Sequence, residues 1–157
     1  GGVSRVQTIP QFLAGHRFFA GLDDEAIALV TGCAVNAHVR PGEYLFREGE
    51  PADTFYVVRH GRVAIQMRQP TGGVVVDTAR DGDVVGWSWL VAPYRWTFDA
   101  VATEETSVVS IDGACLRGKC ESDPALGYAL LQRVVQVMST RLHSARVRLL
   151  DLYGRRS

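Results

Sequence analysis

Seven short runs of β-branched and aromatic residues, separated by glycine-containing turns, constrain the fold of this chain more than any other feature. The runs cover residues 35–39, 44–46, 55–58, 63–67, 74–79, 97–102 and 107–111. The turns between them contain Gly42, Gly49, Gly61, Gly72, Gly73 and Gly82. Brief strands with regular turn signals are typical of an antiparallel sandwich or roll. We therefore predict an α+β fold that is mainly β, namely an antiparallel β-roll (jelly-roll, double-stranded β-helix).

Helical patterns flank the predicted strands on both sides. Asp23 and Asp24 precede an apolar pattern that ends near Gly32, as expected of a capped amphipathic helix. Asp123 and Pro124 are typical of the first residues of a second, longer helix. With 157 residues the chain is one domain's worth. We divide it into an N-terminal helical part (1–34), a β-roll (35–112) and C-terminal helices (113–157).

The last helix carries an apolar seam at alternating spacings of four and three residues. Its members are Leu131, Val135, Met138, Leu142, Ala145, Leu149 and Leu152. Such heptad spacing is typical of helices that pair with a second helix. A second apolar set, Leu126, Leu130, Val134 and Val137, follows another face in the first turns only. We predict that the second set covers the roll and that the seam meets a second copy; packing of both faces within one chain is the alternative.

The spacing of the turn glycines is more specific than the fold class. The run from Arg40 to Val63, with Gly42, Gly49 and Gly61 at its turns, resembles the first half of the cyclic nucleotide-binding domain of catabolite-activator-type regulators. Residues 82–102 resemble the phosphate-binding cassette of that family: Gly86 opens a short apolar segment, and a strand resumes at Phe98. The resemblance extends over about residues 12–153. It implies a regulatory sensor that dimerises through its last helix.

The cassette departs from the family pattern where the ligand is held. The resemblance implies a glutamate for the ribose hydroxyl and an arginine for the cyclic phosphate, but Trp87 and Phe98 occupy those positions and Asp99 replaces a small hydroxyl residue. Asp99 is expected to repel a phosphate, whereas Arg95 could act as a surrogate cation. The candidate ligand residues are Val85, Gly86, Trp87, Ser88, Trp89, Arg95, Phe98, Asp99 and Ala100.

Three interpretations of this aromatic cassette remain open. The rings could fill the former pocket, which would leave a ligand-free scaffold or assembly domain. They could line a site for a neutral or aromatic molecule. Backbone N–H groups at Gly86–Trp89 and Arg95 could also still bind a cyclic nucleotide. We expect canonical cAMP binding to be weakened or lost, and a cyclic nucleotide or other small-molecule effector is the one cofactor-like ligand that the sequence suggests.

Several other functions find no support in the sequence. No arrangement of nucleophile, base and paired carboxylates stands out, so we expect a non-enzymatic module without a catalytic or metal site. The chain has an odd number of cysteines, namely Cys33, Cys115 and Cys120. This count predicts no disulfide framework and is consistent with a reducing compartment. No apolar run is long enough to cross a bilayer, which favours a cytoplasmic protein without membrane contact.

Charge and the chain ends add further expectations. Residues 124–157 carry six arginines against one aspartate although the whole chain is neutral, and we read them as a basic helix face that complements the body rather than a nucleic-acid surface. Gly1-Gly2 without an initiator Met is typical of a remnant of expression or of processing. No helix-turn-helix follows Gly154, which favours a stand-alone sensor over a regulator whose DNA-binding part was removed.

Overall fold

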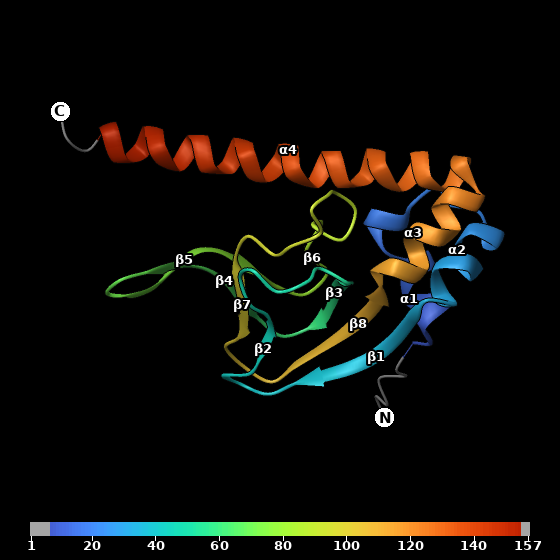
Figure 1. The fold of residues 1–157 in the computed structure, drawn as a ribbon, viewed down its shortest axis with the longest axis horizontal. Coiled ribbons are helices and arrows are strands. Elements are labelled where there is room, and N and C mark those ends of the chain that lie inside the picture. The colour runs from blue at the N-terminus through green and yellow to red at the C-terminus, as the bar shows by residue number, and fades with distance from the viewer. Residues whose placement is uncertain (1–6, 155–157) are drawn as a thin grey trace, which may run out of the picture.

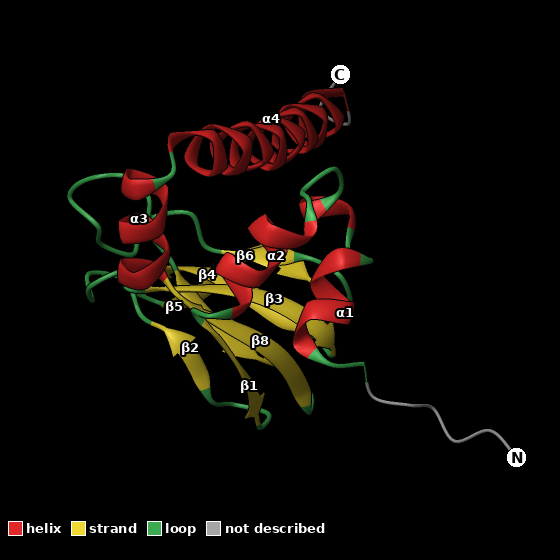
Figure 2. Cartoon of the chain, turned by 90° about the vertical axis from the view of Figure 1, so that its right-hand side faces the viewer, coloured by secondary structure: helices red, strands yellow, loops and turns green. Residues whose placement is uncertain are grey.

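The fold consists of two four-stranded antiparallel sheets, with helices at one end and a long helix along one side (Figures 1 and 2). A computed structural model describes residues 7–154. One sheet has the order β1 (Ala34–Val39), β8 (Thr106–Asp112), β3 (Thr54–His60), β6 (Val84–Val85). The other has the order β2 (Tyr44–Phe46), β7 (Asp99–Ala102), β4 (Val63–Gln69), β5 (Gly72–Ala79). The predicted β-roll is confirmed. Gly1-Gly2 and the terminal Arg155 and Arg156 lie outside the described residues.

The seven predicted runs all contain strands, and one further strand was missed. β6 has only two residues, pairs with Tyr56 and Val57 of β3, and directly precedes Gly86. Such a short element gives too little alternation for a pattern to be read from sequence. The space between the sheets is filled by Phe46, Val58, Val63, Val85, Trp96, Ala100 and Val108, all buried. The inner face of the cassette is therefore part of the roll's core.

The N-terminal part forms three short helical elements that close one end of the roll (Figure 2). They are α1 (Ile9–Ala14), the 3-10 turn η1 (Arg17–Phe19) and α2 (Asp24–Thr31). Asp23 caps α2, because its carboxylate accepts a hydrogen bond from the Ala26 N–H at 2.8 Å. The chain leaves α2 at Gly32, as predicted.

Two C-terminal helices follow the last strand: α3 (Gly113–Ser122) and α4 (Pro124–Gly154). Asp123 accepts a hydrogen bond from the Leu126 N–H at 3.2 Å, which confirms the predicted start of α4. Leu126, Leu130 and Val134 are buried against the N-terminal helices, and Val137 packs on the same cluster. The second apolar set therefore packs inside the domain, in a core cluster that the N-terminal helices share with the roll. Figure 1 shows α4 running along the whole roll, with its C-terminal half above the β4–β5 hairpin. None of the helices in residues 7–154 is long and apolar enough for a membrane span.

The expectation that the cysteines form no disulfide is wrong. Cys33 and Cys115 are joined, whereas Cys120 is a free thiol. The two partners are 82 residues apart in sequence, but the Cys33 carbonyl accepts a hydrogen bond from the Asp112 N–H at 2.8 Å, which brings β1 next to the start of α3. Only the tertiary fold creates this proximity. An odd cysteine count is consequently no argument for a reducing compartment in this chain.

Arginines on α4 bind the body of the domain, as the interpretation of the basic helix face predicted. Guanidinium groups donate hydrogen bonds to three backbone carbonyls: Arg133 to Ala20, Arg141 to Val84, and Arg148 to Val76 at 3.1 Å. The three arginines are spaced by eight and seven residues, so they lie on one side of the helix. They fasten α4 to the N-terminal part through Arg133 and to the roll through Arg141 and Arg148.

Candidate functional site

The cassette is shaped by Gly86, where the chain leaves β6. Its φ is 93°, a conformation that side-chain-bearing residues rarely adopt. A Cβ at this position would lie 2.6 Å from the ring of Trp96. That ring is stacked on Phe46 with 3.7 Å between centroids and 10° between planes. Gly86 thus allows Trp96 to pack flat between the cassette backbone and β2.

A cavity of about 670 Å³ lies between the roll, the cassette and α4. Trp96 and Phe46 line its inner end, and Trp87 and Phe98 line its cassette side. Ile65, Met67 and Val76 come from β4 and β5. The cassette aromatics thus leave a substantial space beside α4, at the place where the sequence predicted a ligand.

The candidate ligand residues divide into two groups. Val85, Gly86, Trp87, Ser88 and Phe98 line the cavity. The structure places the other four, Trp89, Arg95, Asp99 and Ala100, away from it. Trp89 is 1% exposed and packs against Phe55 in the core beneath the N-terminal helices. Ala100 is buried within the roll.

Asp99 does not present its carboxylate to the cavity, contrary to expectation. One oxygen accepts a hydrogen bond from the Glu48 N–H at 2.7 Å, and the other lies 3.1 Å from Nε of Arg68. Burial alone would raise the pKa of Asp99, but these two partners outweigh burial and hold the pKa below its ordinary value. The charge is neutralised by these partners, so Asp99 links β7 to β4 and to the turn after β2 rather than repelling a ligand.

Arg95 does not reach the cavity. Its Nη1 donates a hydrogen bond to the Gly49 carbonyl at 3.1 Å, on the outside of the loop that approaches Pro51. The residue is exposed. The cavity receives its positive charge instead from α4, through Arg141 and Arg148, with Asp77 as the acidic residue of its wall.

Arg141 is a cavity residue that was not predicted from the sequence. Its guanidinium carbon lies 5.2 Å from the centre of the Trp87 ring, and its Nε lies 3.6 Å from Asp77 Oδ2. Its spacing in the sequence would have indicated this position, because Arg141 and Arg148 are seven residues apart and follow Val134 on the side of α4 that faces the body. Which strand they meet depends on the tertiary fold.

Four of the seven seam residues also line the cavity: Val135, Met138, Leu142 and Ala145. The other three, Leu131, Leu149 and Leu152, are 47%, 55% and 60% exposed. The seam is therefore turned outward along α4 while its middle forms one wall of the cavity.

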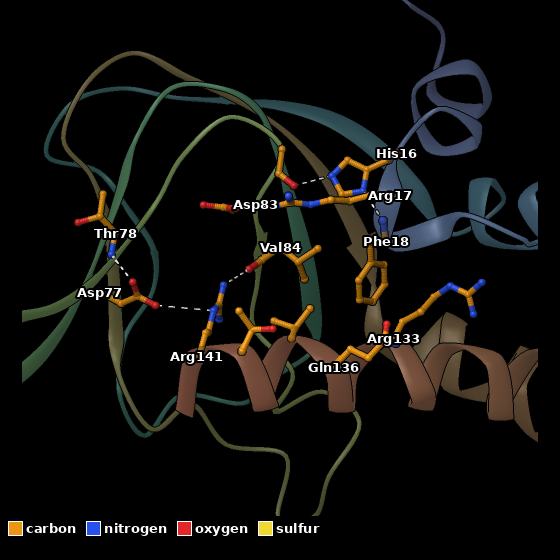
Figure 3. A pocket seen from close by; sticks show the side chains of 13 residues that line it. His16, Arg17, Phe18, Asp77, Thr78, Asp83, Val84, Arg133, Gln136 and Arg141 are labelled. Carbon is orange, nitrogen blue, oxygen red and sulfur yellow. Dashed lines mark hydrogen bonds and ion pairs between the residues drawn. The ribbon is translucent and has the colours of Figure 1, made fainter. Parts of the chain in front are cut away.

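A second, more polar cavity of about 510 Å³ lies on the other flank of α4 (Figure 3). Asp77 and Arg141 border both cavities. His16 joins the N-terminal part to the cassette here: its Nε2 contacts the Gly82 carbonyl, and its Nδ1 accepts a hydrogen bond from the Phe18 N–H at 3.0 Å (Figure 3). This pairing requires the neutral imidazole with the proton on Nε2.

The pairing of His16 predicts a pH-dependent stability. Burial lowers the pKa of His16 below 6.5, against the opposing effect of the Gly82 carbonyl. The unfolded chain binds this proton at higher pH than the folded chain does. The contribution of His16 to the free energy of unfolding is therefore complete above pH about 6.5 and declines as the pH falls below that value. Urea unfolding of the native protein and His16→Gln should show a free-energy difference that shrinks from pH 7.5 to pH 5. A difference that does not change with pH would contradict the buried neutral state.

Comparison with known proteins decides the family. The family profile described as "Cyclic nucleotide-binding domain" matches residues 37–123, more than half of the chain. This chain belongs to the cyclic nucleotide-binding domain family.

Among the residues the structure describes, no group of three or more His, Cys, Asp or Glu side chains is placed to hold a metal ion.

Relatives of this cyclic nucleotide-binding domain include bacterial regulators. The chain is 30% identical over 143 residues to the CRP-like cAMP-activated global transcriptional regulator of Mycobacterium tuberculosis; the match covers 90% of this chain and 62% of the regulator. A solved cyclic nucleotide-binding protein structure from Geobacter metallireducens GS-15 superposes with a TM-score of 0.79 at 31% identity, covering 87% of this chain and all of that one. The sensor domain of the regulator DNR from Pseudomonas aeruginosa shares the fold, with a TM-score of 0.69 at 20% identity, covering 85% of this chain and 90% of that domain.

Proposed function

We propose that this domain is a non-enzymatic regulatory sensor whose cavity binds a small molecule other than a cyclic nucleotide and reports occupancy through α4. One observation carries the proposal: a cavity of about 670 Å³ remains at the cassette although Trp87 and Phe98 stand where the family's glutamate and arginine are expected. The apolar wall favours an apolar ligand body. The remaining volume argues against a fully plugged, ligand-free scaffold.

Loss of the two charged groups weakens the hold on a sugar-phosphate anion. A hydrogen bond to a charged group contributes ~1.5–3 kcal/mol, so two lost bonds correspond to ~3–6 kcal/mol, roughly 10²–10⁴ in affinity. The matched regulator of M. tuberculosis is described as cAMP-activated, which makes cAMP the ligand to compare against. The backbone around Gly86 alone does not replace the missing side chains.

Titration calorimetry with cAMP and cGMP tests the proposal. We expect no saturable binding of either nucleotide at micromolar concentrations by the unmodified domain. The double variant Trp87→Glu/Phe98→Arg should gain cAMP affinity, because it restores both charged partners beside the intact Gly86 turn. The variant Trp87→Ala/Phe98→Ala opens the same space without the charges and should gain none. Micromolar cAMP binding by the unmodified domain would overturn the proposal.

We further propose that two copies pair through the α4 seam, as expected for an effector domain of a transcription regulator or a sensor acting in trans. The support is the sustained heptad spacing together with the exposure of Leu131, Leu149 and Leu152. The chain spans 62% of the length of the matched M. tuberculosis regulator, so the activity of a whole regulator belongs to this proposal as well.

A further inference from the structure

We propose that the ligand of the α4 cavity has an apolar body and a single compact anionic head, such as an aromatic carboxylate, and that Arg141 pairs with the head. The inference rests on the proposed function and names the ligand class for the same cavity. This arrangement differs from the family pattern, in which the cassette supplies the charged residues. Here the cassette side of the cavity is apolar, and the positive charge comes from α4.

The wall of the cavity consists of a large apolar part and a few ionic residues. Trp87, Trp96 and Phe98 present rings from the cassette side, and Phe46 and Ile65 extend the apolar surface across the roll. Ser88, Thr97 and Ser139 are the small polar residues of the wall. Its ionic residues are Arg141, Arg148 and Asp77, which leave a net positive charge. An apolar wall with one excess cation is complementary to a monoanion with an apolar body.

Arg141 is placed to receive such a head group. Its side chain is 25% exposed and lies over the Trp87 ring, where the surroundings are apolar. One Nη donates to the Val84 carbonyl, and Nε faces Asp77 Oδ2 at 3.6 Å (Figure 3). These contacts occupy two of the five guanidinium N–H groups. The 3.6 Å separation exceeds a normal hydrogen-bond length, so Asp77 provides a loose partner.

Asp77 is itself engaged elsewhere. Its Oδ1 accepts a hydrogen bond from the Thr78 N–H at 2.8 Å, and its side chain is 36% exposed (Figure 3). A carboxylate in the cavity could therefore form the closer, charge-assisted pair with Arg141 while Asp77 stays bonded to its own strand. Arg148, two turns further along α4, adds a second positive charge at the same wall.

Matched pairs of an acid and its neutral amide test the contribution of the anionic head group to binding independently of the apolar body. Phenylacetate, 1-naphthaleneacetate and 1-pyreneacetate are titrated against the domain by calorimetry beside their neutral amides. For the size that fits, we expect the acid to bind at least about tenfold more tightly than its amide, the ratio that one charge-assisted bond supplies. Cyclic AMP serves as the nucleotide comparison.

Three variants on the same helix assign the preference to one side chain. Arg141→Met should bring the acid and the amide to equal affinity, whereas Arg133→Met removes an arginine that lies outside this cavity and should keep the ratio. Arg141→Lys, which retains the charge, should keep most of the preference and covers the case in which the methionine variant fails to fold. Thermal melting checks folding of each variant.

The outcomes are distinguishable. Equal binding of acid and amide by the unmodified domain overturns the anionic head group while the proposed apolar sensor stands. Binding of neither series overturns both proposals. An acid preference that survives in Arg141→Met overturns the role of Arg141.

Discussion

Replacing Leu149 with glutamate is expected to convert a dimer of this domain into a monomer. Leu149 lies in the middle of the seam's C-terminal half, is 55% exposed in the single chain and does not line either cavity. In a two-fold pair the change removes two leucines from the interface and brings in two like charges. Burial of a leucine contributes about 1.5–3 kcal/mol. Because a two-fold dimer loses two leucines, its dissociation constant should rise by roughly 10²–10⁴.

Light scattering and sedimentation at tens of micromolar measure this change directly. Val147→Glu is the matched control: Val147 is 42% exposed on the same helix but points away from the seam, so this variant should remain dimeric. The monomer's stability should be unaffected in both variants, since both side chains are exposed in the single chain. A native protein that is monomeric at these concentrations would contradict the proposed pairing.

Opening the Cys33–Cys115 disulfide is expected to destabilise the domain by about 4 kcal/mol. The bond closes a loop of 82 residues, and a cross-link across a long loop lowers the entropy of the unfolded chain substantially. Guanidinium unfolding of the oxidised protein should be compared with that of the reduced and alkylated protein. Cys33→Ala/Cys115→Ala should show a similar loss, because it also leaves the unfolded chain unconstrained.

Cys120→Ala controls for the loss of a thiol as such. Cys120 is a half-buried free cysteine on α3, five residues from Cys115, and its replacement should cost less than about 1 kcal/mol. Mass spectrometry of the alkylated native protein should find one reactive thiol rather than three. Equal stability of the oxidised and reduced protein would contradict a structural role of the bond.

The candidate residues of the cassette lie in two different surroundings in the structure. Gly86, Trp87 and Phe98 could be placed at the site because the turn glycines fix the order of the strands, and the structure brings these residues to one cavity. Asp99 and Arg95 bond instead to Arg68 and Gly49, which are distant from them in sequence. A carboxylate or guanidinium looks free in a sequence until the neighbouring strand is known.

The sequence by itself determined most local elements: every strand except the two-residue β6, the capped starts of α2 and α4, and the two apolar faces of the last helix. These depend on short-range patterns of burial, capping and backbone conformation, which a linear chain displays. Only the tertiary structure decided that Cys33 meets Cys115, that Asp99 is neutralised, and that Arg141 enters the cavity. Each of these contacts joins residues more than thirty positions apart or a helix to a sheet, and its existence depends on how the packed elements are placed in space.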